Sequence, residues 1–205
     1  MSVTEAAATT TGTISDEDLL RSHWYRLLAR LLEKPPSLEV MALARGLAGD
    51  DTPFGEAVSA LAKSAEATTV ETLDTEYHEL FYGVGRGELV PHLSYYLTGF
   101  LNEKPLGQLR ADMARLGIAR ADGVSEPEDH MAQLCDMMAG LILGEFDEPV
   151  GEMAGKTFFD AHVGPWAVKF FEDLEGAQAS SFYMPVGRVG RLFMEIEAQA
   201  YEMAN

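Results

Sequence analysis

Apolar residues recur at helical spacing along most of the chain. Between Asp16 and Lys34, one apolar stripe comprises Leu20, Trp24, Leu27, Leu28, Leu31 and Leu32. Ser15 precedes this stripe as a potential N-cap, and Lys34-Pro35-Pro36 follows as a stop, because proline cannot continue a helix. Similar spacing predicts further helices at 37–48, 54–66, 70–83, 94–102, 105–117, 126–145, 147–162, 165–178 and about 186–203.

No useful stretch of the sequence alternates with the period of two that is typical of strands, and no strand–helix–strand rhythm or internal repeat occurs. The pattern therefore predicts an all-α protein, a bundle of about nine or ten helices. Residues 117–125 are polar and contain glycine, which makes them a candidate hinge loop between two subdomains. We expect a tail at 1–15, an N-terminal helical half at 16–120 and a C-terminal half at 121–205, sharing one core.

The composition narrows the classes of partner. The chain has 205 residues, 47% of them hydrophobic, and a formal net charge of −18. This charge argues against nucleic acid and against anionic membrane surfaces, since both require clustered Lys and Arg. It would attract a basic peptide segment, although solubility alone also explains it.

The location predicted for the protein is the cytoplasm. A single cysteine, Cys135, excludes an internal disulfide and lies in an apolar helical run, where a buried, inert thiol is expected. The N-terminal residues lack the basic and apolar regions of a secretory signal. No apolar run reaches the roughly 18 residues of a membrane span, so membrane insertion is not expected.

Known catalytic motifs do not occur. The five histidines form no HExxH pair, no Glu-x-x-His motif is present, and the glycines of "GVGRG" at 83–87 lack the lysine of a phosphate-binding loop. No G-x-S-x-G occurs, and Cys135 has no evident base beside it. We therefore expect no metal, no cofactor and no enzymatic activity.

The segment "SEPEDH", residues 125–130, is open to three interpretations. Ser125 and Glu128 match the capping box of a helix beginning near 126, with Asp129 adding favourable charge in the first turn. His130 is not explained by that role. A carboxylate and an imidazole exposed at a hinge could instead grip a partner, or Glu126, Asp129 and His130 could form an acid–base site.

Four segments resemble the TorD/DmsD family, the redox enzyme maturation proteins. "EPEDH" at 126–130 resembles the family's signature, and "EYHELFYGVG" at 76–85 is similar to its Tyr-x-x-Leu-Phe-x-Gly-Pro-Gly segment. "PHLSYY" at 91–96 matches Pro-x-x-Ser-x-Tyr, and 158–174 resembles a His-x-x-Pro-Trp segment with an aromatic-rich helix. Val84 departs from the family, which often has proline there. The likeness spans about residues 16–203, in the same order.

The resemblance implies an all-helical cytosolic chaperone. Such proteins bind the catalytic subunit of a molybdopterin enzyme, many through its twin-arginine signal peptide, and hold it until the cofactor is inserted. A chaperone of the same fold for a non-exported subunit is the alternative. A monomer is expected, and the resemblance adds a domain-swapped dimer as a second possibility.

The candidate client-binding residues come from three of these segments. An acidic rim and an apolar groove would suit a peptide with a basic end and an apolar stretch. The residues are Tyr77, Phe81, Tyr82, Pro91, Ser94, Tyr96, Glu126, Asp129 and His130. In the fourth segment, Gly164 and Pro165 are expected to separate two helices, with Pro165 at the first helical position. Trp166, Phe170 and Phe171 are then expected to face the core.

Overall fold

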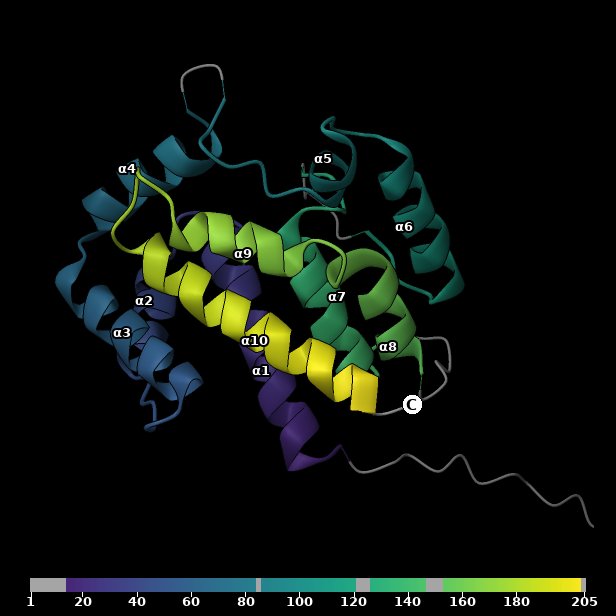
Figure 1. The fold of residues 1–205 in the computed structure, drawn as a ribbon, viewed down its shortest axis with the longest axis horizontal. Coiled ribbons are helices and arrows are strands. Elements are labelled where there is room, and N and C mark those ends of the chain that lie inside the picture. Colours follow the sequence, from purple (N-terminus) through teal and green to yellow (C-terminus); the bar gives the residue numbers. More distant parts are fainter. Residues whose placement is uncertain (1–13, 84–85, 121–125, 147–152, 204–205) are drawn as a thin grey trace, which may run out of the picture.

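The computed structural model describes residues 14–83, 86–120, 126–146 and 153–203. In these ranges the chain forms ten α-helices and a short π-helix, with no β-strand (Figure 1). The elements are α1 (Asp16–Leu32), α2 (Leu38–Arg45), α3 (Pro53–Ala67), α4 (Val70–Phe81), α5 (Leu93–Thr98), α6 (Lys104–Arg115), α7 (Met131–Leu143), α8 (Ala154–Phe158), η1 (Phe159–Val163), α9 (Ala167–Glu175) and α10 (Tyr183–Met203). The prediction of an all-α bundle is confirmed.

Short polar side chains start the first four helices. Ser15 accepts a hydrogen bond from the backbone N–H of Asp18, as the sequence predicts, and Ser37 caps α2 in the same way. Thr52 and Thr69 cap α3 and α4 through their hydroxyl oxygens. Each cap gives an acceptor to an N–H group that has no partner inside its helix, which fixes where the helix begins.

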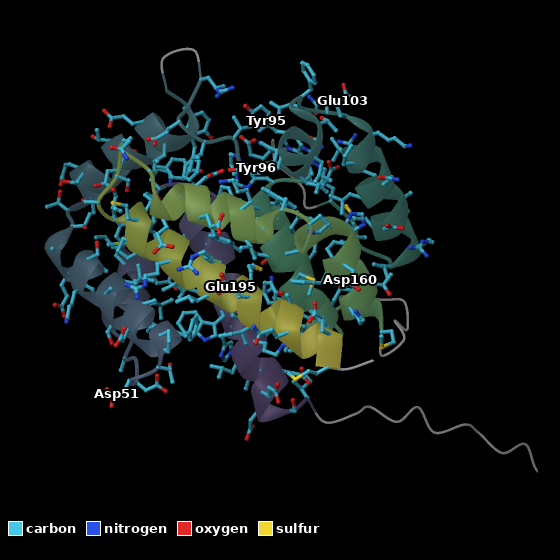
Figure 2. All side chains as sticks on the ribbon, viewed as in Figure 1. Asp51, Tyr95, Tyr96, Glu103, Asp160 and Glu195 are labelled. Atoms are coloured by element: carbon cyan, nitrogen blue, oxygen red, sulfur yellow. The ribbon has the colours of Figure 1, made fainter. Side chains whose placement is uncertain are left out.

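One hydrophobic core joins both ends of the sequence. Helix α1 packs against α7, and α10 packs against α9 and α3 (Figure 1). Acidic side chains such as Asp51, Glu103, Asp160 and Glu195 come from separate parts of the fold, so the negative charge is spread over the molecule (Figure 2).

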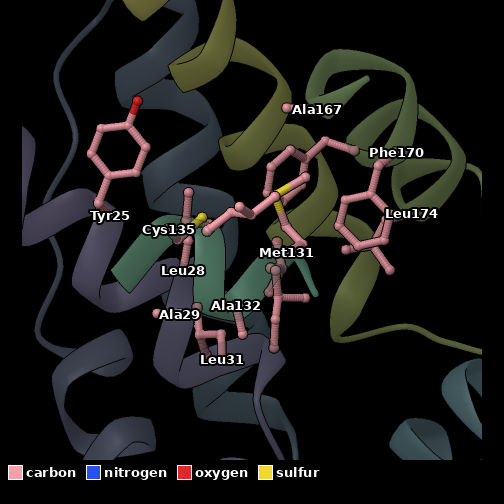
Figure 3. Close-up of a cluster of buried hydrophobic side chains, with 14 of the residues drawn as sticks. Tyr25, Leu28, Ala29, Leu31, Met131, Ala132, Cys135, Ala167, Phe170 and Leu174 are labelled. Carbon is pink, nitrogen blue, oxygen red and sulfur yellow. The ribbon is translucent and has the colours of Figure 1, made fainter. Parts of the chain in front are cut away.

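Figure 3 shows the centre of the core, where Leu28 of α1 lies beside Cys135 of α7, with Tyr25 of α1 and Phe170 of α9 in the same cluster. Cys135 is fully buried, and burial raises the pKa of its thiol far above the ordinary value, so it is inert as a nucleophile. The helical halves expected at 16–120 and 121–205 both contribute to this core. Residues 1–13 of the expected tail (1–15) and residues 121–125 of the candidate hinge (117–125) lie outside the described residues.

Several helix starts differ from the sequence prediction, and α10 begins at Tyr183, about three residues earlier than expected. Residues 126–130 are not helical, and α7 begins at Met131. The helix expected at 147–162 is described only from Ala154, and its last part is the π-helix η1. Helix α9 begins at Ala167 with Trp166 as its N-cap, so Pro165 stands before the helix and not at its first position.

The aromatic residues of α9 face the core, as predicted. Trp166 is 2% exposed, and Phe170 and Phe171 are fully buried. The indole N–H of Trp166 donates to the carbonyl oxygen of His162 at 2.9 Å, which satisfies the polar atom of a buried ring. Among the described helices, none is both long and apolar enough to cross a membrane.

Candidate functional site

Two of the sequence motifs meet in space. Pro91–Tyr96 and Glu126–His130 run side by side, and His92 and His130 form an isolated antiparallel bridge. The backbone N–H of Leu93 donates to the carbonyl oxygen of Asp129 at 3.0 Å, and that of Met131 donates to the carbonyl oxygen of Pro91 at 2.8 Å. We call these two segments, 91–96 and 126–130, the motif junction. It joins the start of α5 to the start of α7.

Asp129 is the acceptor at the centre of the motif junction. Its Oδ2 accepts from the backbone N–H of Ser94 at 2.9 Å and from the Ser94 hydroxyl at 2.5 Å, and its Oδ1 lies 3.3 Å from Nδ1 of His92. Burial raises the pKa of Asp129, but the hydrogen bonds from His92 and Ser94 outweigh it, so the pKa falls below its ordinary value. Asp129 is 1% exposed, so its ionised carboxylate is hydrogen-bonded within the chain and does not face solvent.

His130 is the N-cap of α7. Its Nδ1 accepts from the backbone N–H of Ala132 at 3.1 Å, a role that requires an unprotonated nitrogen. Burial lowers the pKa of His130 to about 3, and the charge of His92, whose ring centroid is 5.0 Å away, adds to the effect. His130 is 5% exposed and neutral. The expectation that Asp129 and His130 are exposed is therefore wrong.

The capping box expected at 125–128 does not form the start of α7. The helix begins after Glu128, whose side chain accepts from Nη2 of Arg110 at 2.7 Å and from Nε at 3.0 Å. Ser125, its expected partner, lies outside the described residues. The ion pair instead fastens α6 to the motif junction, because Arg110 lies on α6. Burial raises the pKa of Glu128, and the hydrogen bond from Arg110 more than compensates, so the pKa is lowered.

Two aromatic side chains at the end of α4 differ in role. The Tyr77 hydroxyl donates to the carbonyl oxygens of Leu32 and Glu33, at 3.1 and 2.9 Å, and the ring is buried. Tyr82 is 52% exposed. Burial, followed by the nearby Glu126 carboxylate, raises the pKa of Tyr82.

Glu126, in the motif junction, and Tyr82, at the end of α4, form an exposed corner. The Glu126 carboxylate is about one third exposed, and its Oε2 lies 3.8 Å from Nε2 of the buried His92. Phe81, half-buried, packs edge-on against the ring of Tyr183 nearby. We call Phe81, Tyr82 and Glu126 the aromatic–acidic corner. In this corner the Glu126 carboxylate, a hydrogen-bond acceptor, lies near the exposed ring of Tyr82.

The remaining candidates, Pro91, Ser94 and Tyr96, are buried or half-buried in segment 91–96. Pro91 and Ser94 are buried. Tyr96 is half-buried, packs at a tilt against the ring of Trp166 with 5.0 Å between ring centroids, and donates from its hydroxyl to Oδ2 of Asp173 at 3.1 Å. The structure thus brings the candidates from 91–96 and 126–130 together, and puts those from α4 at one side.

Sequence reasoning missed two residues. His92 lies within the matched segment 91–96 but has no position in its Pro-x-x-Ser-x-Tyr pattern. Glu76, on α4, accepts from the hydroxyls of Ser180 and Ser181 and from the backbone N–H groups of Ser181 and Phe182. No local pattern could have paired Glu76 with residues more than a hundred positions away. Across the described part of the chain, no three His, Cys, Asp or Glu side chains are placed to hold a metal ion.

Comparison with known proteins decides the family. The profile of the Nitrate reductase delta subunit family matches residues 47–172. The chain belongs to this family. The resemblance to TorD-like redox enzyme maturation proteins, inferred from the four motifs, is thereby confirmed, and the matched range contains the whole motif junction.

Individual relatives are consistent with this family assignment. A protein of Vibrio cholerae named Chaperone protein TorD is 25% identical over 193 residues, which covers 89% of this chain and 82% of the relative. The TorD of Aliivibrio fischeri is 26% identical over 84% of this chain and 86% of its own length. A crystal structure named for a redox enzyme maturation protein of Archaeoglobus fulgidus superposes with a TM-score of 0.59 at 18% identity, covering 92% of this chain and 99% of that one. This last likeness shows a shared fold.

Proposed function

We propose that this chain is a maturation chaperone for a molybdopterin enzyme. It binds the catalytic subunit of that enzyme, through a twin-arginine signal peptide or the apoprotein, and holds it until the cofactor is inserted and the subunit is exported. The observation that carries the proposal is similarity over most of the chain to proteins named TorD chaperones. The chain acts by binding and not by catalysis.

The geometry of the motif junction supports two roles for the candidate residues: the exposed ones contact the client, and the buried ones hold them in position. The aromatic–acidic corner, together with the half-buried Tyr96, offers ring surface and a carboxylate to a segment with apolar and basic side chains. The buried candidates Tyr77, Pro91, Ser94, Asp129 and His130 fix the backbone that presents this surface. An acid–base role for Glu126, Asp129 and His130 is disfavoured, because Asp129 and His130 are buried, Asp129 accepts from Ser94, and Nδ1 of His130 accepts from Ala132.

A second candidate client is a subunit that is not exported. The family to which the chain belongs is described as a subunit of nitrate reductase, and this description names no signal peptide. In that case the aromatic–acidic corner binds an N-terminal segment without twin arginines.

Co-purification from the native host tests the proposal. The tagged chain is expressed at its normal level, and bound proteins are identified by mass spectrometry with mapping of their N-termini. We expect the catalytic subunit of a molybdenum enzyme. An intact twin-arginine leader supports the first client and an N-terminus without one supports the second. Recovery of no molybdenum-enzyme subunit would contradict both.

A matched pair of variants connects the partner to the site. Tyr82→Ala with Glu126→Gln removes the exposed ring and the charge of the aromatic–acidic corner. Leu43→Ala with Glu39→Gln removes a similarly exposed apolar side chain and one charge from α2. We expect the first pair to reduce recovery of the client severalfold, and the second to leave it unchanged.

A further inference from the structure

An acidic cleft lies beside the motif junction, on the side of α7. Its volume is about 120 Å³. Four carboxylates line it: Glu126 and Glu128 from the junction, Asp136 from α7 and Glu145 after α7. Two guanidinium groups, from Arg26 and Arg120, also line it, and Arg110 of α6 pairs with Glu128 at 2.7 Å, which leaves one carboxylate in excess. We call it the α7 cleft.

Apolar side chains complete the α7 cleft. They include Ile118, Met137 and Phe146. A long cationic side chain has the complementary structure, because its methylene groups pack on apolar surface while its charged end reaches carboxylates. Methionine is flexible and polarizable, so it adapts to such a stem. The cleft therefore fits an arginine or lysine better than a small cation.

The chain already places one guanidinium group in the α7 cleft. Arg26, on α1, donates from Nη1 to Asp136 and from Nη2 to Glu145, so one side chain bridges two carboxylates. The side chains of Asp136 and Glu145 are 53% and 45% exposed. Ion pairs this exposed are weak, since water and salt screen them. An arginine supplied by a partner can therefore compete with Arg26 for these two carboxylates.

We propose that the α7 cleft binds an arginine side chain from the basic segment of the client, and that Arg26 occupies that place in the free chain. This inference rests on the proposed function and specifies where the positive end of the client is held. Asp136 and Glu145 are then positioned to receive the client's guanidinium while the aromatic–acidic corner, which shares Glu126 with the cleft, contacts the neighbouring part of the segment.

Removal of Arg26 provides the test, because the expected result is a gain. The probe is a synthetic peptide with two adjacent arginines before an apolar stretch, titrated calorimetrically into the full chain. Arg26→Gln frees Asp136 and Glu145, and we expect it to tighten binding roughly two- to fivefold, the range that corresponds to one exposed ion pair. A peptide with glutamines in place of the arginines should show no such gain.

Arg191 offers a matched control. It bridges Glu175 and Glu195 at 2.8 and 3.0 Å, as Arg26 bridges its own two carboxylates, but on α9 and α10. Arg191→Gln changes the net charge by the same amount and frees two carboxylates away from the cleft. Its affinity for the arginine peptide should stay within about twofold of the original. An equal gain in both variants would assign the effect to overall charge and overturn the inference.

A loss-of-binding variant completes the design. Asp136→Asn leaves Arg26 paired with Glu145 and should weaken binding of the arginine peptide, while Glu195→Gln should not. If the unaltered chain binds the arginine peptide but Arg26→Gln and Asp136→Asn leave its affinity unchanged, the inference is wrong and the proposed function stands. If the unaltered chain binds neither peptide, the signal-peptide form of the proposed function fails, and the inference fails with it.

Discussion

At the scale of single residues, the motif junction depends on buried polar atoms that satisfy one another. Asp129 accepts two hydrogen bonds from Ser94 and contacts His92, while His130 accepts from Ala132. Residue identity at positions 126–130 was enough to select these side chains from the sequence. It could not show that they face inward, because burial depends on the approach of 91–96, a segment more than thirty residues away.

Replacing Asp129 should destabilise the fold. Asp129→Ala leaves the N–H and hydroxyl of Ser94 buried without their acceptor, at roughly 1–3 kcal/mol for each donor. We expect the free energy of unfolding, measured with urea, to fall by at least about 2 kcal/mol. Asp160→Ala, at an exposed position on η1, is the control and should change it by less than about 0.5 kcal/mol. If Asp129→Ala keeps its stability but no longer binds client, Asp129 contacts the client directly and a structural role for it is wrong.

His130 should make stability depend on pH. Its pKa of about 3 in the folded state lies below the value near 6.5 of an unfolded imidazole, so the unfolded chain takes up the proton first as pH falls. Stability should decline below about pH 6.5 by up to about 1.4 kcal/mol per pH unit. The lowered pKa of Asp129 acts in the same direction at lower pH.

The variant His130→Asn tests this source of the decline. Asparagine can cap a helix but does not titrate, so the unfolding free energy should fall less steeply between about pH 6.5 and pH 4.5. His78→Asn, at an exposed position on α4, should keep the original profile. Parallel profiles for His130→Asn and the unaltered chain would show that other groups cause the decline.

At the scale of elements, the apolar pattern located the helices, while local caps set some of their ends and long-range contacts set others. The spacing predicted α1 almost to the residue, because Ser15 and the two prolines mark its limits in the local sequence. It placed the start of α7 five residues early, since "SEPED" has the residues of a cap but Glu128 pairs with Arg110 of α6. The start of α10 depends on Glu76, which no nearby residue reveals.

Trp166 should contribute strongly to the packing of α9. Trp166→Ala removes a ring that contacts Tyr96 and Phe170, at roughly 3–5 kcal/mol for a buried tryptophan. For a chain of this length, we expect the melting temperature to fall by roughly 6–20 °C, measured by circular dichroism. Trp24→Ala, at a partly exposed ring, should lower it less. An unchanged melting temperature with lost client binding would move the binding surface to α9.

Glu76 should hold the start of α10 in place. Burial raises the pKa of Glu76, but hydrogen bonds from Ser180, Ser181 and Phe182 reverse the shift, so the carboxylate is ionised and accepts from all three. Glu76→Gln replaces one of its two oxygens by a donor and should cost roughly 1–3 kcal/mol. Hydrogen exchange should accelerate at 181–186, whereas Glu79→Gln, exposed on the same helix, should leave it unchanged. Unchanged exchange in Glu76→Gln would show that α10 starts without this contact.

At the scale of the whole molecule, the net charge of −18 favours basic partners over long distances. The charge is spread over many helices, so it attracts without specifying a contact (Figure 2). We propose that specific binding uses the motif junction and the cleft beside it, where carboxylates lie next to apolar side chains. The sequence showed the total charge, but which carboxylates gather in one place follows from the packing of α1, α6 and α7.

Salt should therefore weaken client binding. The dissociation constant of the arginine-containing peptide is expected to rise as salt increases, because exposed charges are screened beyond about 8–10 Å near physiological ionic strength. The peptide with glutamines should show a smaller dependence. Equal salt dependence of the two peptides would contradict an electrostatic contribution from the arginines.

The central claim is that the chain recognises its client before cofactor insertion. The most direct measurement compares its affinity for the client's catalytic subunit purified from cells that make molybdopterin and from cells that do not. A maturation chaperone should bind the cofactor-free subunit at least about tenfold more tightly, which corresponds to about 1.4 kcal/mol. Equal affinity for the two forms, or tighter binding of the loaded enzyme, would contradict the account.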